Sequence, residues 1–278
     1  MPARSSAGGS EVLSSYKHVT MNAMTNQIFS LGTPINENTP IFRVFSRKWL
    51  LEMFRSKQLA LRPPHKWDDP FENFLLKCNV TILGHQNQSL AGVIKNYYGQ
   101  CWSLNHETDA TWRIYSPNKD GVRVSTTVGR LLRSIYNPND PFRLQSYHIG
   151  SVAYIEEAEL KRLFEEPGYT AGLVLDPNGI GQSRHLFLKR KEFEHENEVR
   201  LLYQYNNASN SDQRSEEYWN VSIEPNALFD DILIDPRMDD HDSSLLEKDL
   251  RGLGYTKQIQ RSSLYQLPNL NIKIELPS

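Results

Sequence analysis

A cluster of carboxylates just before an apolar stretch is the part of this sequence best suited to chemistry. Glu194, Glu196 and Glu198 recur at spacings of two, and Arg200 follows them. Side chains two residues apart project to the same side of an extended segment, so one site would receive Glu196 and Glu198. One carboxylate could orient a substrate hydroxyl or stabilise a cationic transition state, and the other could act as a base. The alternative is the end of a solvated helix in which Glu196 pairs with Arg200 at spacing i,i+4.

A second acidic stretch lies earlier in the chain and combines carboxylates with aromatic side chains. Trp67, Asp69 and Glu72 belong to the sequence WDDPFE, in which the proline restricts the residue before it to an extended conformation. We interpret this stretch as a rigid acidic loop that frames a pocket. The structural alternative is that an aspartate caps the following turn while the aromatic side chains close an edge of the core.

A third stretch, CWSLNHETDATWRIY at residues 101–115, contributes further candidates for a ligand pocket. Its aromatic side chains, Trp112 among them, are most simply explained as core. Tyr115 could instead face a ligand as a stacking surface, and Arg113 could clamp an anion.

Arg43 lies within residues 41–45, IFRVF, whose alternation predicts an early and central strand. An arginine buried in such a strand is unfavourable unless it is paired or used. It could pair with one of the acids described above, or it could receive a phosphate or pyrophosphate.

The composition indicates a soluble cytoplasmic protein that does not carry a general affinity for polyanions. The chain has 278 residues, a formal net charge of −2 and two cysteines, Cys78 and Cys101. The near-neutral charge gives no global field that favours nucleic acid or an anionic membrane. Two cysteines of unrelated spacing argue against a disulfide framework and a cysteine-based zinc site. No apolar run is long enough for a signal peptide or a membrane span, and the common dinucleotide, P-loop and hydrolase motifs are absent.

The pattern of elements predicts an α+β fold in one domain, with a twisted, mainly antiparallel sheet flanked by helices. We expect residues 1–38 to form a flexible or loosely docked arm and residues 39–278 to form the domain. Apolar periodicity and capping residues such as Ser46 predict mixed helices and strands along the domain, without regular βαβ alternation. The predicted helices include 47–57, 108–115, 128–136 and 185–193, and the predicted strands include 58–62, 100–104, 199–205, 231–234 and 270–275.

Several of these motifs, taken in order, resemble the bacterial domain of unknown function 2971. Members of that family carry an acidic Asp-Pro-Phe-Glu loop, a Cys-x-Ser segment, a Trp-x-x-Tyr helix, a Gly-Val-x-Val strand and a Glu-x-Glu-x-Arg motif. The resemblance extends over about residues 40–265, and it implies a bacterial protein of a phage-defence or toxin system. The corresponding segments here are 67–72, 101–103, 112–115, 121–124 and 193–200.

The order of three residues also resembles the ADP-ribosyltransferases. That fold places an arginine on its first strand, a serine segment on a middle strand and a Glu-x-Glu before a later strand, as Arg43, Ser103 and Glu196-x-Glu198 are ordered here. The resemblance implies that NAD is the cofactor and that Arg43 holds its phosphate or ribose. It further implies that Ser103 braces the nicotinamide end, that Tyr115 stacks on the nicotinamide, and that Glu198 stabilises an oxocarbenium-like state. The partners would be a nucleotide and a nucleic acid or protein target.

Two other functions remain open from the residues alone. The first is a metal-dependent nuclease, in which oxygen ligands for Mg²⁺ come from Asp68, Asp69, Glu72, Glu196 and Glu198, and Lys189 or Lys191 lies near the scissile phosphate. The second is a non-enzymatic binding or sensing module, in which the acids pair with arginines in buried networks at the edge of a pocket.

Overall fold

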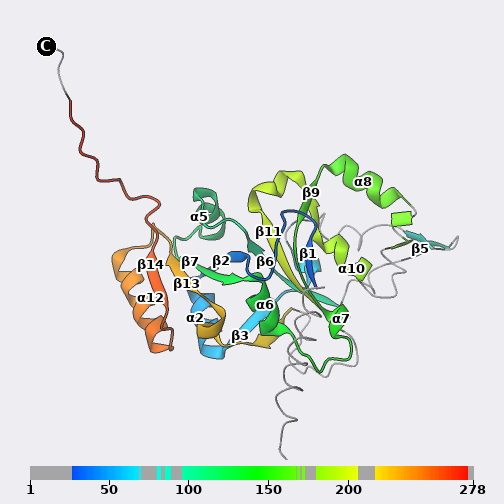
Figure 1. Cartoon of the computed structure of the whole chain (residues 1–278), viewed down its shortest axis with the longest axis horizontal. Coiled ribbons are helices and arrows are strands. Elements are labelled where there is room, and N and C mark those ends of the chain that lie inside the picture. The colour runs from blue at the N-terminus through cyan, green and yellow to red at the C-terminus, as the bar shows by residue number, and fades with distance from the viewer. Residues whose placement is uncertain are drawn as a thin grey trace, which may run out of the picture.

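A large mixed sheet forms the centre of the computed structural model, which describes residues 27–67, 69, 80–82, 85–88, 96–166, 168–169, 171–172, 180–205 and 217–274. Its strand order is β1-β8-β11-β6-β2-β7-β13-β14 (Figure 1). The two outermost pairs, β1 with β8 and β13 with β14, are parallel, and the five pairs between them are antiparallel. The predicted α+β class with a mainly antiparallel sheet is therefore confirmed. In sheet order the strands are β1 (Ile28–Ser30), β8 (Tyr147–Ser151), β11 (Glu198–Gln204), β6 (Tyr97–Ser103), β2 (Pro40–Ser46), β7 (Gly121–Thr127), β13 (Asp231–Ile234) and β14 (Gln258–Arg261).

Three two-stranded ribbons accompany the main sheet. One ribbon is parallel and pairs β9 (Ala153–Ile155) with β10 (Leu188–Arg190). Strand β10 comes directly before the carboxylate cluster in the chain. The other two ribbons are antiparallel: β3 (Gln58–Leu61) with β12 (Trp219–Ser222), and β4 (Val80–Ile82) with β5 (His85–Gln88).

Short helices connect and flank the strands, and several begin at side chains that cap them. Ser46, Thr108, Thr127 and Asp239 each accept a hydrogen bond from the backbone amide three residues later, which satisfies an otherwise unpaired donor at the helix start. Helices α2 and α6 contact strands of the main sheet, and α12 packs on α2 (Figure 1). The helices are α2 (Arg47–Ser56), α5 (Asp109–Tyr115), α6 (Val128–Ile135), α7 (Arg143–Ser146), α8 (Glu157–Glu165), α10 (Ile180–Arg184), α11 (Pro225–Leu228) and α12 (Asp240–Gly252), with 3₁₀ turns η1 (Pro64–Lys66), η2 (His185–Phe187) and η3 (Lys191–Glu196).

The sheet is covered on both faces near β11, because neighbouring residues of that strand belong to different apolar clusters. Leu201 packs in the main core together with Leu50 and Trp102, whereas Leu202 packs in a smaller cluster with Phe187. Consecutive strand residues point to opposite faces, so β11 is buried from both sides. Polar side chains of β11 are therefore removed from water wherever they fall.

A seam divides the sheet between β6 and β2. These two strands are joined by one register pair, Phe42 with Ser103, whereas β2 pairs with β7 along its whole length. The Arg43 guanidinium on β2 donates a hydrogen bond to the Cys101 carbonyl oxygen on β6. The side chain of this arginine thus links the two halves of the sheet.

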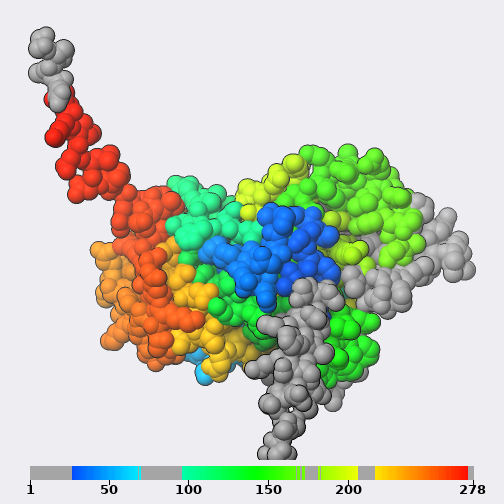
Figure 2. All heavy atoms as spheres, in the orientation of Figure 1, coloured from blue at the N-terminus to red at the C-terminus, as the bar shows by residue number. Residues whose placement is uncertain are grey.

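Two predicted elements are wrong. Residues 185–193, expected to be one helix, form η2, β10 and the start of η3, because Leu188–Arg190 pairs with β9 and cannot also form helical hydrogen bonds. The strand expected at 270–275 has no partner along its described residues. Leu270, Ile272 and Ile274 are 69%, 79% and 83% exposed, and the segment leads away from the body (Figure 2).

Strand β1 lies inside the segment 1–38 that the sequence assigns to an arm. It adds a parallel edge strand to β8, and the division of the chain at residue 39 stays a prediction. None of the helices in the described ranges is long and apolar enough to cross a membrane.

Candidate active site

The carboxylate cluster lies on a tight turn that joins η3 to β11. Asn197 sits between them in the left-handed conformation, with φ 45° and ψ 56°, a region that asparagine tolerates better than most residues. Its side chain donates to Asn105 Oδ1 at 3.2 Å and accepts from Thr33 Oγ1 at 3.3 Å. Glu196 and Glu198 therefore do not belong to one extended segment.

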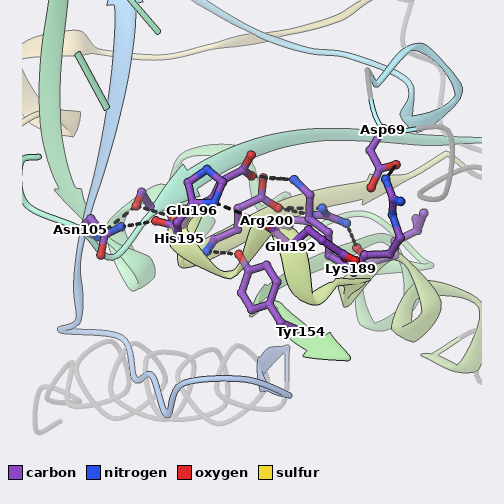
Figure 3. Close-up of polar contacts among 12 residues, drawn as sticks. Asp69, Asn105, Tyr154, Lys189, Glu192, His195, Glu196 and Arg200 are labelled. Atoms are coloured by element: carbon purple, nitrogen blue, oxygen red, sulfur yellow. Dashed lines mark hydrogen bonds and ion pairs between the residues drawn. The ribbon is translucent and has the colours of Figure 1, made fainter. Parts of the chain in front are cut away.

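Lys189 brings the two carboxylates together in spite of that turn. Its ammonium nitrogen lies 2.6 Å from Glu196 Oε2 and 3.2 Å from Glu198 Oε1, as Figure 3 shows for Glu196. The Lys189 side chain is 6% exposed, and its ammonium lies 4.6 Å from the centre of the Phe193 ring. A single buried cation thus serves two acids that the sequence predicts to face one site.

Arg200 holds the other oxygen of Glu198. Its Nε and Nη2 lie 2.8 and 2.7 Å from Glu198 Oε2, and Nη1 donates to the Leu186 carbonyl oxygen at 2.6 Å. The guanidinium is fully buried and lies 4.7 Å from the Trp67 ring. The i,i+4 pairing of Glu196 with Arg200 is therefore wrong as an account of this motif, because the arginine pairs within β11.

The two carboxyl groups differ in acidity because their neighbours differ. Burial opposes ionisation of Glu198, but Arg200 and Lys189 outweigh it and lower the pKa of Glu198 to about 2. Burial, and then the hydrogen bond and charge of Glu198, raise the pKa of Glu196 to about 7 against the weaker pull of Lys189. Near neutral pH, Glu198 is ionised and Glu196 exchanges its proton readily.

The Glu196→Gln variant is expected to lose a pH dependence of stability that the wild type has. The pKa of Glu196 is about 7 in the folded chain against an ordinary value of 4.5, so the folded state binds more protons between these values. Wild-type stability therefore falls as pH rises from about 4.5 to 7, with a slope of up to about 1.4 kcal/mol per unit. Urea unfolding across this range measures the slope. Glu194→Gln, at an exposed position, is the control, and an unchanged slope in Glu196→Gln would contradict the assignment.

Ser103 supports the carboxylate turn from the neighbouring strand. It is the register partner of Glu198, and its hydroxyl donates to the Glu196 carbonyl oxygen at 2.7 Å and accepts from the Asn105 amide at 3.0 Å. Asn105 in turn donates to the His195 carbonyl oxygen at 2.9 Å. Both of these hydrogen bonds join the hydroxyl to backbone groups, so Ser103 acts on the turn.

Arg43 reaches the same region through the seam. Its guanidinium interacts electrostatically with Glu198 and Tyr115, and burial lowers its pKa. Its Nε is buried and has no hydrogen-bond partner within the described parts of the chain. A buried guanidinium N–H without a protein acceptor is suited to donate to an anionic ligand.

Helix α5 presents one aromatic residue to the site and buries the other. Tyr115 ends the helix with 47% of its side chain exposed. Burial of its hydroxyl, followed by the charges of Glu196 and Glu198, raises the pKa of Tyr115. Trp112 is 1% exposed and donates to Glu107 Oε1 at 2.7 Å, so the structure gives it a place in the core.

The acidic loop reaches the site through β10. Asp69 is buried and lies 3.1 Å from Arg190, which follows Lys189 in the chain (Figure 3). Trp67 approaches the sheet at Gly99, where an added Cβ would lie 2.8 Å from the Trp67 ring. Glu72 lies outside the described residues.

Four contributors to this network were not among the candidates from sequence: Tyr154, Asn105, Arg190 and Asn197. Lys189 was a candidate only for the nuclease, near a scissile phosphate, and its contact with the two acids was not predicted. Lys189 and Arg190 belong to a KRK run, which has the composition of a solvated surface. The Tyr154 hydroxyl oxygen accepts from the Glu198 amide at 2.8 Å, a contact over 44 residues that no local pattern indicates. In the described ranges, no three His, Cys, Asp or Glu side chains are placed to hold a metal ion.

A family comparison covers this part of the chain. The model of DUF2971, a protein of unknown function, matches residues 111–201. The resemblance to that family is confirmed over these residues. They run from α5 into β11, and so include Tyr115, Lys189, Glu196, Glu198 and Arg200.

The structural comparison finds similar solved chains of one protein, Thermus sp. 2.9 DarT. Its complex with NAD+ is 10% identical, with a TM-score of 0.38, over 82% of this chain and 98% of that one. Its complex with ADP-ribosylated ssDNA is 9% identical, with a TM-score of 0.38, over 84% and 98%. Its complex with carba-NAD+ is 12% identical, with a TM-score of 0.36, over 82% and 97%. No curated protein matches the sequence.

Proposed function

We propose that this chain is an NAD-using enzyme of the ADP-ribosyltransferase type with Glu198 as its principal catalytic residue. The observation that carries the proposal is the placement of three residues on adjacent strands. Glu198 of β11 is the register partner of Ser103 on β6, and Ser103 is the register partner of Phe42, which precedes Arg43 on β2. The order of residues that resembles the ADP-ribosyltransferases is thus gathered at one end of three neighbouring strands.

The charges at this end suit a ligand that is anionic in one part and becomes cationic in another. The unused Nε of Arg43 would donate to a phosphate or ribose oxygen of NAD. The ionised Glu198 carboxylate would stabilise positive charge where the bond between ribose and nicotinamide breaks. Tyr115, half exposed at the end of α5, would stack on the nicotinamide, and Ser103 would brace this end of the site through the turn that it holds.

Glu196 fits a separate role in the same reaction. Its pKa of about 7 allows it to take a proton near neutral pH, which a general base requires. The group that loses this proton would be the acceptor on a nucleic acid or protein target. The role of the whole chain as a toxin or phage-defence effector is part of the proposal, and it follows from the family resemblance.

One observation favours a second function, a non-enzymatic binding module. Both oxygens of Glu198 already contact cations, since Lys189 holds Oε1 and Arg200 holds Oε2. A network of this kind can serve stability alone. In the enzyme Glu198 acts on the bound substrate, whereas in the binding module Glu198 only stabilises the folded chain.

Ligand binding by the wild-type chain tests whether NAD is the ligand and separates this proposal from the nuclease. We expect NAD to raise the unfolding temperature, with a stabilisation of about 2.7 kcal/mol at a concentration one hundred times Kd. Differential scanning fluorimetry with NAD, with Mg²⁺ alone and with neither measures this. The absence of a shift at millimolar NAD would overturn the NAD proposal. A shift with Mg²⁺ alone would favour the nuclease.

A further inference from the structure

The ribbon of β9 and β10 contacts the carboxylate turn at two points that lie side by side. Lys189 and Tyr154 are register partners in this ribbon. The Lys189 ammonium contacts both carboxylates, and the Tyr154 hydroxyl accepts from the Glu198 amide at 2.8 Å. One side chain therefore fixes the acidic groups and its partner fixes the backbone between them (Figure 3).

Lys189 occupies the position from which one cation can act on both acids. Arg200 contacts Oε2 of Glu198, which leaves Oε1 to Lys189. The Glu196 carboxylate contacts the same ammonium at 2.6 Å, and the Phe193 ring covers that ammonium. A flexible ammonium with three donors can satisfy two carboxylates at once.

We propose that Lys189 is a positioning residue that holds the Glu196 and Glu198 carboxylates side by side and supplies the positive charge that the two acids share. The inference rests on the proposed function for its catalytic consequence only. That one lysine positions two acids follows from the contacts of Lys189 with Glu196 and Glu198, whether or not the chain is an enzyme.

Other charged and titratable groups face this pair from the elements around it. Tyr154 lies on β9, Arg200 on β11 and Tyr115 on α5, and each interacts electrostatically with Glu198. Arg43 acts on Glu198 from β2. These groups remain in a variant that lacks only the Lys189 ammonium, so the variant isolates its effect.

The test compares Lys189→Met with Lys191→Met, which removes an exposed ammonium 3.9 Å from Glu194. The rate of NAD turnover is measured from pH 5 to 9. Glu196, with a pKa of about 7, titrates within this range and sets the acid limb of the profile. We expect this limb to move up by about one pH unit in Lys189→Met, since loss of a nearby cation disfavours the ionised acid. This gives a roughly fivefold lower kcat at pH 7 with a KM changed less than twofold, whereas Lys191→Met keeps the wild-type profile. A profile that does not move, with activity lost in proportion to folded protein, would overturn the proposal.

A second readout does not depend on activity. Carbon-13 NMR of glutamate carboxyl groups in the full chain follows Glu198 directly, in Glu196→Gln and in Lys189→Met/Glu196→Gln. The double variant avoids leaving two acids without their shared cation, so it remains usable if Lys189→Met fails to fold. A Glu198 titration raised in the double variant supports the role of Lys189 even if the wild type proves unable to use NAD, and an unchanged titration rejects that role whatever the activity.

Discussion

Glu198→Gln is expected to reduce NAD turnover by about 100- to 1000-fold in a chain that still folds and binds NAD. The loss of one preorganised group that stabilises developing charge has effects of about this size. Glutamine keeps the shape and one oxygen acceptor, so it can still accept from Arg200, which lies 2.7 Å from Glu198 Oε2. The negative charge opposite the ribose is what the variant removes.

The control for this variant is Glu194→Gln, which changes an exposed carboxylate on η3, the 3₁₀ turn that precedes Glu198. NAD turnover is measured by release of nicotinamide, and folding is measured on the same samples by thermal unfolding. A Glu198→Gln chain that keeps more than about a tenth of wild-type turnover would contradict a catalytic role. Activity that falls only as far as the folded fraction falls would favour the binding module.

Arg200→Met is expected to cause the largest loss of stability of any change described here, about 3–5 kcal/mol. The guanidinium is fully buried and makes two contacts with Glu198 and one with the Leu186 carbonyl oxygen. Its removal leaves a buried carboxylate short of a partner and a buried carbonyl group without its donor. Urea unfolding at pH 7 measures the loss.

The loss of stability in Arg200→Met should become smaller as the pH falls. The pKa of Glu198 is lowered to about 2 from its ordinary value of 4.5, so its contribution to stability is present above about 4.5 and is lost as pH falls toward 2. The deficit of Arg200→Met should therefore be largest at pH 7 and smaller at pH 3. Arg162→Met removes an exposed ion pair on α8 and should change stability by less than about 1 kcal/mol. A deficit independent of pH would mean that packing on Trp67, not charge, is what Arg200 supplies.

The parts of the fold that the sequence predicts well are those encoded within a few residues. Ser46 caps the helix that follows it, and the strand predicted at residues 231–234 forms with those bounds. Each signal depends on backbone geometry over one turn or a few strand residues. The candidates Glu198, Arg200 and Trp67 could be selected from sequence because their motifs mix acidic, basic and aromatic residues. In the structure Arg200 contacts both of the others.

The parts that the sequence does not predict depend on pairing across long distances in the chain. Lys189 and Arg190 are charged residues in a short segment, and only the pairing of Leu188–Arg190 with β9 directs Lys189 to the acids. The expected helix at 185–193 fails for the same reason. The left-handed conformation of Asn197 was also not predicted, because asparagine adopts it only where its surroundings require it.

The seam between β6 and β2 has a consequence for how the molecule opens. Strands β1, β8, β11 and β6 lie on one side of it, and β2, β7, β13 and β14 lie on the other. Hydrogen exchange in native proteins follows cooperative units bounded by weak pairing, so the slowest-exchanging amides should form two groups and not one central block. Arg43 belongs to one group and Glu198 to the other, and a ligand that both residues hold would tie the two units together.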